Sequence, residues 1–290
     1  MTGRAAFTKT GAFPVLVGVV SFALVIALVE LLIRVGVINR FIVPLPSQIG
    51  GAFERIILEE DVLVVSRCID TSAHALPWWS QIVTLIFGMG TGCIKHARFA
   101  LTLREAFWAA FLLTMFGVGI GVLLHRIRIL RLATETWVAA MASAPTVLMY
   151  PLFLVIFGRS ENTIIMMGFV AGLAPVILKT VEGLAGTRRV LIDVGRSFKL
   201  TPWQLYWKIL FPAALPSIFV GIKLGMIFAL INIVGVEFLI NFGGLGQLIN
   251  ELAERYDLAG TYAAICFVIL VSVLFFMFTE RVERWLRPVN

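Results

Sequence analysis

The chain has 290 residues, of which 60% are hydrophobic and only 14% are charged. Soluble domains carry charge on about a quarter of their residues, so this composition excludes a soluble protein and indicates a polytopic membrane protein. Each polar stretch is shorter than the ~50 residues that a separate domain needs. The net charge of +7 is spread over short loops beside apolar runs, a pattern typical of membrane topology and not of nucleic-acid binding.

Residues 14–35 are predicted to form the first membrane span, and residues 1–13 before them are expected to be cytoplasmic. The apolar run continues to Ile33, which is too long for the ~7–15-residue core of a cleaved signal peptide. Glu30 and Arg34 stand four residues apart, so they can form an ion pair near the outer end of this helix.

Residues 36–105 are expected to be an extracytoplasmic segment. Pro44 and Pro46 interrupt the chain near its start, and Ser47 is a candidate cap for a short amphipathic surface helix over residues 48–61.

The apolar stretch within residues 66–98 is predicted not to cross the membrane. Its uninterrupted core is about a dozen residues long, whereas a span needs about 20. A span here would also prevent the basic residues at 125–131 and 182–216 from both lying on the side of the N-terminus. Cys68 and Cys93 fall in this stretch, and a disulfide between them is a hypothesis.

Residues 106–283 are predicted to form a core of five further spans, and residues 284–290 a cytoplasmic tail. The apolar runs that mark these spans are 106–124, 136–157, 163–179, 217–240 and 263–278. Fifteen of the 24 lysines and arginines fall in the four segments that six spans would place on one side. This excess marks that side, with both termini, as cytoplasmic.

Residues 182–216 form the longest basic interruption of the apolar runs. One helix is predicted over residues 184–198. A second is predicted over 202–211, with Thr201 as N-cap, Pro202 at the first helical position and Gln204 at the capping-box position.

Two prolines, Pro212 and Pro216, are expected to end this second helix before the next span. On physical grounds alone, a lipid anchor and a protein-docking surface explain the basic segment equally well. Tryptophans suit the headgroup region and arginines suit acidic lipid, whereas an exposed pair of short helices suits a partner protein.

The stretch DVGRSFKLTPWQLYWKILFPAALP resembles the cytoplasmic coupling loop of ABC-importer permeases. That motif reads Glu-Ala-Ala, three residues, Gly, nine residues, Ile-x-Leu-Pro. Asp193 stands at the Glu, Val194 and Gly195 at the two alanines, and Ile209 at the Ile, with Phe211 and Pro212 at the Leu-Pro. Lys199 stands where the motif has the glycine that lets the two coupling helices meet, so Thr201 and Pro202 are expected to supply the break.

More narrowly, this stretch and PLPSQIGGAFERI resemble the nitrate/taurine/bicarbonate-type permeases. The resemblance implies an all-α, six-span, type I importer permease in the bacterial inner membrane. It also implies a second permease copy, an extracytoplasmic solute-binding protein that delivers a small anion, and ABC ATPase subunits. The residues expected to couple to the ATPase are Asp193, Val194, Gly195, Arg196, Lys199, Thr201, Pro202, Trp203, Ile209 and Pro212.

ATP with Mg²⁺ is expected on that partner subunit, and no cofactor is expected on this chain. The glycine-rich run at 88–96 lacks the spacing of a phosphate-binding loop. The three histidines have no ligand-like spacing, so no metal site is predicted, and no nucleophile–base pair indicates catalysis. The alternative function is a secondary transporter or a membrane scaffold whose basic loop is only a lipid anchor.

Polar residues within the spans are candidates for the translocation path. Glu237 is ionisable, and such groups face a protein interior or a watery cavity, so both substrate contact and structural hydrogen bonding remain open for it. Asn232 and Asn241 flank it. Ser143, Thr146 and Tyr150 form a polar stripe, which either lines the path or satisfies backbone groups freed by Pro145. Gly168 and Gly172 have the spacing of close helix packing.

Overall fold

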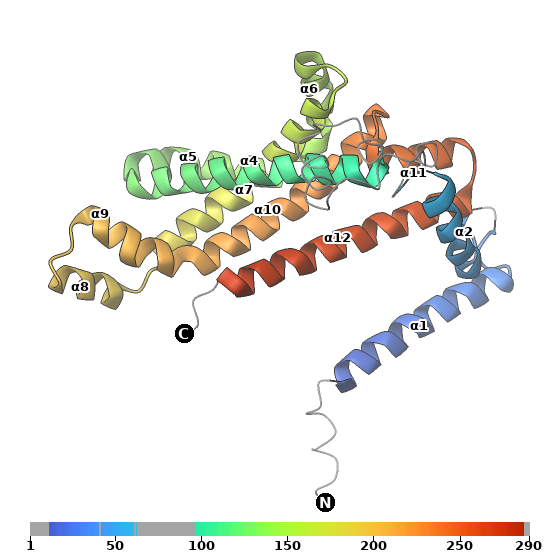
Figure 1. Cartoon of the computed structure of the whole chain (residues 1–290), viewed down its shortest axis with the longest axis horizontal. Coiled ribbons are helices and arrows are strands. Elements are labelled where there is room, and N and C mark those ends of the chain that lie inside the picture. Colours follow the sequence, from blue (N-terminus) through green and yellow to red (C-terminus); the bar gives the residue numbers. More distant parts are fainter. Residues whose placement is uncertain (1–11, 41, 61, 63–96, 287–290) are drawn as a thin grey trace, which may run out of the picture.

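The computed structural model describes residues 12–40, 42–60, 62 and 97–286, and every regular element in these ranges is a helix (Figure 1). Of the predicted non-spanning stretch, residues 66–96 lie outside the described residues, and so do Cys68 and Cys93. In chain order the helices are α1 (Ala12–Arg34), α2 (Pro46–Glu59), α4 (Arg98–Arg126), α5 (Arg128–Ser143), η5 (Thr146–Met149), α6 (Tyr150–Phe157), α7 (Glu161–Ala185), α8 (Arg189–Ser197), α9 (Pro202–Leu205), η6 (Tyr206–Leu210), α10 (Phe211–Ile240), α11 (Gly244–Glu254) and α12 (Leu258–Leu286).

Five described helical runs are long and apolar enough to cross a membrane, and α5 with α6 makes a sixth if the bent pair is counted as one span. The five runs are Leu16–Arg34, Arg98–Arg126, Glu161–Ala185, Pro202–Ile240 and Leu258–Arg281. The all-α, multi-pass architecture predicted from the sequence is therefore confirmed.

The third predicted span is broken rather than kinked, because the axes of α5 and of the η5–α6 segment meet at 92°. Ala144 is extended, with φ −72° and ψ 137°, as expected for a residue that precedes a proline. Pro151 lies in the first turn of α6, where a missing N–H does no harm. As a result α6 projects away from the bundle (Figure 1).

The expectation that prolines end the second helix of the basic segment is wrong. The helical path runs without interruption from Pro202 through η6 and α10 to Ile240. The π-helical turn η6 makes this possible, since its wider hydrogen bond joins the amide of Phe211 to the carbonyl of Tyr206 just before Pro212. The first helix of the segment is also shorter than predicted: α7 ends at Ala185, and α8 begins only at Arg189.

The centre of the bundle is α7, which packs between α4 and α10. A Cβ atom on Gly172 would lie 2.5 Å from the carbonyl oxygen of Gly225, and one on Gly225 would lie 2.6 Å from that of Gly172. The two backbones therefore touch, as the small-residue spacing of Gly168 and Gly172 predicted.

At one end of the bundle, α2 and α11 pack against α12 through buried Ile56, Leu248 and Leu252. The helix α2 begins at Pro46 with Leu45 as its N-cap, so the expected capping role of Ser47 is wrong. Instead, Ser47 Oγ donates to Glu30 Oε1 at 3.5 Å. The predicted Glu30–Arg34 ion pair is confirmed at 2.5 Å. Beyond this contact with α2, the helix α1 stands away from the bundle (Figure 1), and only 6% of its apolar stretch is buried.

Candidate functional site

The start of α9 has the capping box that the sequence predicted. Thr201 caps α9, because its Oγ1 accepts a hydrogen bond from the amide of Gln204 at 3.3 Å. In return, Gln204 Oε1 accepts from the amide of Thr201 at 3.1 Å. Pro202 occupies the first turn of α9, where its fixed φ favours helix formation.

Lys199 makes the bend that its motif assigns to glycine. Its φ is +53°, in the left-handed region. Its amide donates to the carbonyl of Arg196 at 2.8 Å, and the amide of Leu200 donates to the carbonyl of Gly195 at 3.2 Å. These two bonds form a Schellman motif at the end of α8, a turn that usually carries glycine. The break thus begins at Lys199, two residues before the expected position.

Gly195 supplies the close approach between the two short helices. It is the buried residue of α8. A Cβ atom there would lie 2.5 Å from Ile209 Cδ1 and 2.5 Å from Leu205 Cδ1, so α8 rests directly on α9 and η6. In the basic segment of residues 182–216, Lys199 therefore supplies the left-handed bend and Gly195 supplies the close approach of the two helices.

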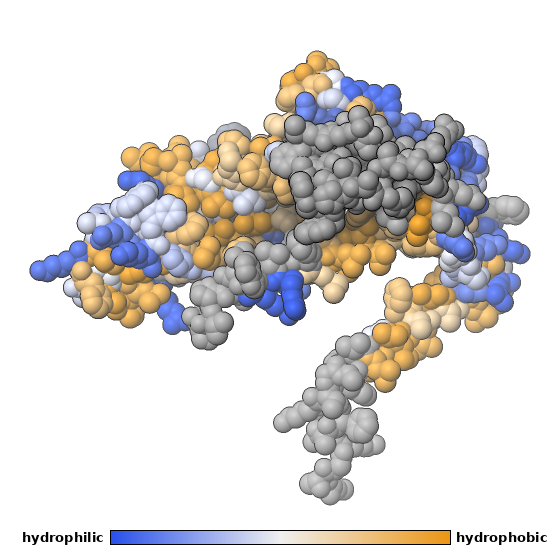
Figure 2. Space-filling view, viewed as in Figure 1, coloured by the Kyte–Doolittle hydropathy of each residue, from blue (hydrophilic) through white to orange (hydrophobic). Residues whose placement is uncertain are grey.

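The basic segment exposes large apolar side chains beside charged ones. Phe198 and Trp203 are 77% and 63% exposed, and the ring of Trp203 packs on that of Trp207 with centroids 5.6 Å apart. Asp193 and Arg196 are also exposed and 3.7 Å apart. Figure 2 shows blue and orange residues mixed over α8 and α9, at the left end of the molecule. The exposed large apolar residues of α8, its cap and this segment are Val190, Leu191, Val194, Phe198, Trp203 and Trp207.

Glu237 lies at the other end of α10, fully buried, and holds the start of α11. Its Oε1 accepts from the hydroxyl of Thr102 at 2.6 Å, and its Oε2 accepts from the amide of Gly246 at 2.8 Å. The hydroxyl of Thr102 also accepts from the amide of Leu245 at 2.9 Å. A negative side chain at a helix N-terminus is favourable because the first amides have no partner within the helix.

The glycines around Glu237 are required by this contact. A Cβ atom on Gly244 would lie 2.0 Å from Glu237 Oε1, and one on Gly246 would lie 2.2 Å from the carbonyl oxygen of Val234. The pattern of apolar runs, which indicates no element between residues 240 and 263, missed α11. It also missed Thr102 and Glu105, which α4 buries beside Glu237. The glycine pattern that follows Glu237 is the signal that could have indicated a close backbone approach.

The other residues of the predicted path divide into two groups. Thr146 and Asn232 are brought together, since Thr146 Oγ1 donates to Asn232 Oδ1 at 2.9 Å and ties the break after α5 to α10. Ser143 is exposed and donates to its own backbone, to the carbonyl of Ala140 at 2.9 Å. Tyr150 packs half-buried beside a core cluster of α4, α7 and α10. Asn241 ends α10 with φ +50°, and its carbonyl accepts from Arg159.

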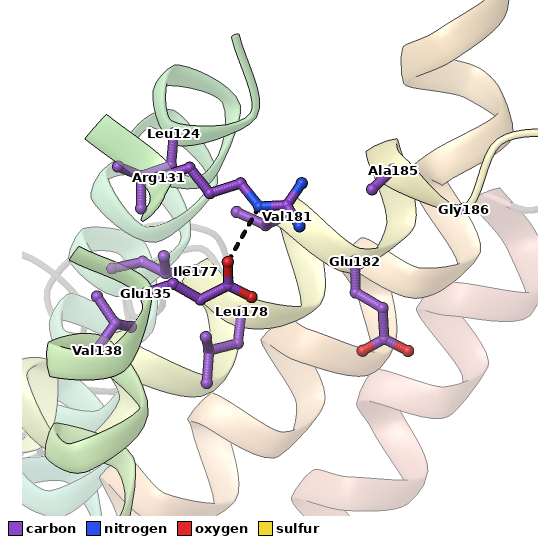
Figure 3. Close-up of a pocket in the computed structure, with 10 residues that line it drawn as sticks. All are labelled: Leu124, Arg131, Glu135, Val138, Ile177, Leu178, Val181, Glu182, Ala185 and Gly186. Atoms are coloured by element: carbon purple, nitrogen blue, oxygen red, sulfur yellow. Dashed lines mark hydrogen bonds and ion pairs between the residues drawn. The ribbon is translucent and has the colours of Figure 1, made fainter. Parts of the chain in front are cut away.

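A pocket of about 490 Å³ opens at the end of the bundle near the α4–α5 turn. In Figure 3 the side chains of Arg131 and Glu135 lie on the α5 side of this pocket, opposite α7, and Arg131 Nε donates to Glu135 Oε2 at 3.1 Å. The far side of the pocket reaches Glu182 and Gly186, in the first residues of the basic segment. The pocket therefore has a charged rim and an apolar wall, next to the basic segment.

Comparison with known proteins places this arrangement in a family. Residues 113–288 match the profile of the binding-protein-dependent transport system inner membrane component. The chain belongs to this family. The long apolar helices described above agree with the multi-pass inner membrane component that this family description names.

Curated relatives match about half of the chain. The riboflavin transport system permease RibX of Chloroflexus aurantiacus is 27% identical over 149 residues, which are 51% of this chain and 56% of that protein. The nitrate import permease NrtB of Synechocystis is 27% identical over 52% of this chain and 54% of its own length. The taurine permease TauC of Escherichia coli is 25% identical over 50% of this chain and 52% of its own.

Solved structures support the same fold. The inward-facing MetNI methionine ABC transporter has a chain that matches with a TM-score of 0.56 and 22% identity, over 63% of this chain and 92% of that one. A chain of an amino acid ABC transporter crystallised with histidines matches with a TM-score of 0.53 and 15% identity, over 73% and 98%. The likeness is that of an importer permease fold.

Proposed function

We propose that the chain is the membrane-spanning subunit of an ATP-driven importer and that it couples to a separate ATPase through residues 182–216. The observation that carries the proposal is the exposed apolar surface of α8 and α9 at the end of a well-capped helix pair. Phe198 and Trp203 expose most of their surface there. Burying large apolar groups away from water is favourable, so exposed ones indicate a surface that a partner covers.

The position of this surface determines which partner would meet which end of the molecule. The basic segment leads directly into α10, whose far end holds Glu237 and α11. ATP with Mg²⁺ would bind the partner ATPase, and a second permease copy would complete the path. With the basic end in the cytoplasm, α2 and α11 lie at the outer end, where a solute-binding protein would dock. Ion pairs between Arg98 and Glu251 (2.7 Å) and between Arg255 and Glu60 (2.9 Å) brace that end.

We propose a small anion of the nitrate, sulfonate or bicarbonate class as the solute. Support comes from the sequence resemblance and from relatives whose names specify nitrate, aliphatic sulfonates and taurine. Other relatives are named for riboflavin and carnitine. Uptake of labelled nitrate, taurine, bicarbonate, riboflavin and carnitine by vesicles that hold the complete transporter distinguishes these classes, and uptake of the last two alone would contradict the anion proposal.

Capture of an ATPase subunit tests the coupling. The full chain, purified in detergent from its native membrane, is expected to retain a nucleotide-binding subunit. Val190→Asp, on the exposed face of α8, is expected to release it. Ile129→Asp is the matched control, because Ile129 is equally apolar and exposed but lies on α5.

Retention of the ATPase by Val190→Asp, or its absence from the wild-type chain, would contradict the coupling proposal. If the wild-type chain carries no ATPase and its basic segment binds only acidic vesicles, the segment is a lipid anchor. The chain would then be a secondary transporter or a membrane scaffold.

A further inference from the structure

A long apolar groove lies between α10 and α12. It consists of two adjoining hollows of about 650 and 210 Å³. The residues that line both hollows are Ile227, Leu230, Ile231, Ser272 and Phe276. Along α10 the groove runs from Lys223 to Phe238, which is about 22 Å at 1.5 Å per residue. That length covers most of the ~30 Å hydrocarbon core of a bilayer.

The wall of the groove selects an apolar occupant along its length. Only two of its lining side chains carry hydroxyls, and each donates to the backbone of its own helix. Ser272 Oγ donates to the carbonyl of Val268 at 2.9 Å, and Thr279 Oγ1 donates to that of Phe276 at 2.8 Å. Neither hydroxyl therefore has a proton left to donate to a ligand inside the groove, and a flexible hydrocarbon chain fits the otherwise apolar wall.

One end of the groove is positively charged. Lys223 Nζ lies 3.8 Å from the centroid of the Phe276 ring, in a cation–π contact. Among the described residues no carboxylate lies within 4.0 Å of this ammonium. Glu280 is near, but its Oε1 accepts from Arg284 Nη2 at 2.9 Å. Three basic residues (Lys223, Arg281 and Arg284) and two acidic ones (Glu280 and Glu283) lie at this end, so it carries a net charge of +1.

We propose that this groove binds an anionic phospholipid, with an acyl chain along α10 and α12 and the phosphate at Lys223. Basic residues at the end of a groove between spanning helices are a recurring way to hold acidic lipid headgroups. The lipid would belong to the leaflet on the side of the basic segment, residues 182–216. In the orientation proposed above, this is the cytoplasmic leaflet. Its binding does not depend on the ATPase or on the transported solute.

Native mass spectrometry of the purified full chain tests the site. Phosphatidylglycerol and phosphatidylethanolamine with identical acyl chains are titrated in detergent. The wild-type chain is expected to retain phosphatidylglycerol about fivefold more strongly, the factor that corresponds to ~1 kcal/mol for one lysine. Lys223→Gln is expected to abolish this preference. Lys208→Gln, which removes an exposed lysine in η6 away from the groove, is expected to keep it.

A second variant examines the groove itself. Ser272→Phe fills the wall common to both hollows and is expected to lower the retention of both lipids severalfold. Equal retention of the two lipids by the wild-type chain, or an unchanged preference in Lys223→Gln, would overturn the proposal. So would the loss of a chain dimer in Ser272→Phe with lipid retention unchanged, because the groove would then be covered by a second copy. If Ser272→Phe does not fold, Lys223→Gln still decides.

Discussion

The hydroxyl of Thr102 on α4 donates a 2.6 Å hydrogen bond to the carboxylate of Glu237 on α10, and both side chains are buried. The same hydroxyl accepts from the amide of Leu245. Two side chains that are 135 residues apart in the sequence thus close the first turn of a third helix, α11.

Glu237→Gln is expected to lower the free energy of unfolding by about 1–3 kcal/mol. The amide NH₂ would face a donor, either the hydroxyl of Thr102 or the amide of Gly246, and leave it unpaired in a buried site. Thermal unfolding in detergent measures the loss. Glu135→Gln is the control, because it makes the same change in a partly exposed carboxylate on α5 that does not contact α11. An equal loss in both variants would contradict the capping role.

Lys199→Gly is expected to stabilise the end of α8 by about 1 kcal/mol, because the left-handed conformation costs an L-residue roughly 1–2 kcal/mol. Lys199→Ala removes the charge but keeps the Cβ atom, so it is expected to have no such effect. Amide hydrogen exchange of residues 195–200 measures the difference. Equal protection in the two variants would attribute the effect to charge instead of backbone conformation.

Gly195→Val is expected to separate α8 from α9 and η6, at a cost of about 1–3 kcal/mol for overpacking, and to reduce capture of the ATPase. The double variant Gly195→Val with Ile209→Ala is expected to recover part of the loss, since Ile209 is one of the two side chains in the way. Gly119→Val is the control, because no atom lies within 4 Å of a Cβ built at Gly119. The absence of any rescue by Ile209→Ala would contradict this packing.

Thr146→Val is expected to cost about 1–3 kcal/mol, because it leaves Asn232 Oδ1 buried without its donor. Ser143→Ala is expected to change stability by less than about 0.5 kcal/mol, since its hydroxyl is exposed. Thermal unfolding compares the two. Uptake of solute by vesicles is measured for both variants. If Ser143→Ala loses uptake at unchanged stability and Thr146→Val keeps it, then Ser143 belongs to the path and Thr146 does not.

Local signals allowed much of the fold to be predicted. The span positions follow from apolar run length, and the capping box at Thr201 follows from the spacing of Thr201, Pro202 and Gln204, which lie within four residues of one another. Lys199 could be identified as anomalous from the motif, but the sequence did not show that its backbone would take the left-handed conformation.

Features set by distant contacts could not be predicted. The sharp break at Ala144 is held by Thr146 and Asn232, which are 86 residues apart. The helix α11 depends on Glu237 and Thr102, and neither lies within it. The continuity of α9, η6 and α10 through Pro212 depends on a π turn, a change of hydrogen-bond register that local helix propensity does not reveal.

That continuity gives the molecule a mechanical property. From Pro202 to Ile240 the chain is one helical rod of 39 residues, about 58 Å long at 1.5 Å per residue. One end carries Trp203, and the other carries the carboxylate that grips α11. In the coupling proposed above, a tilt imposed on the surface at Trp203 would be carried along this rod to α11, and the backbone contact between Gly172 and Gly225 would be its pivot.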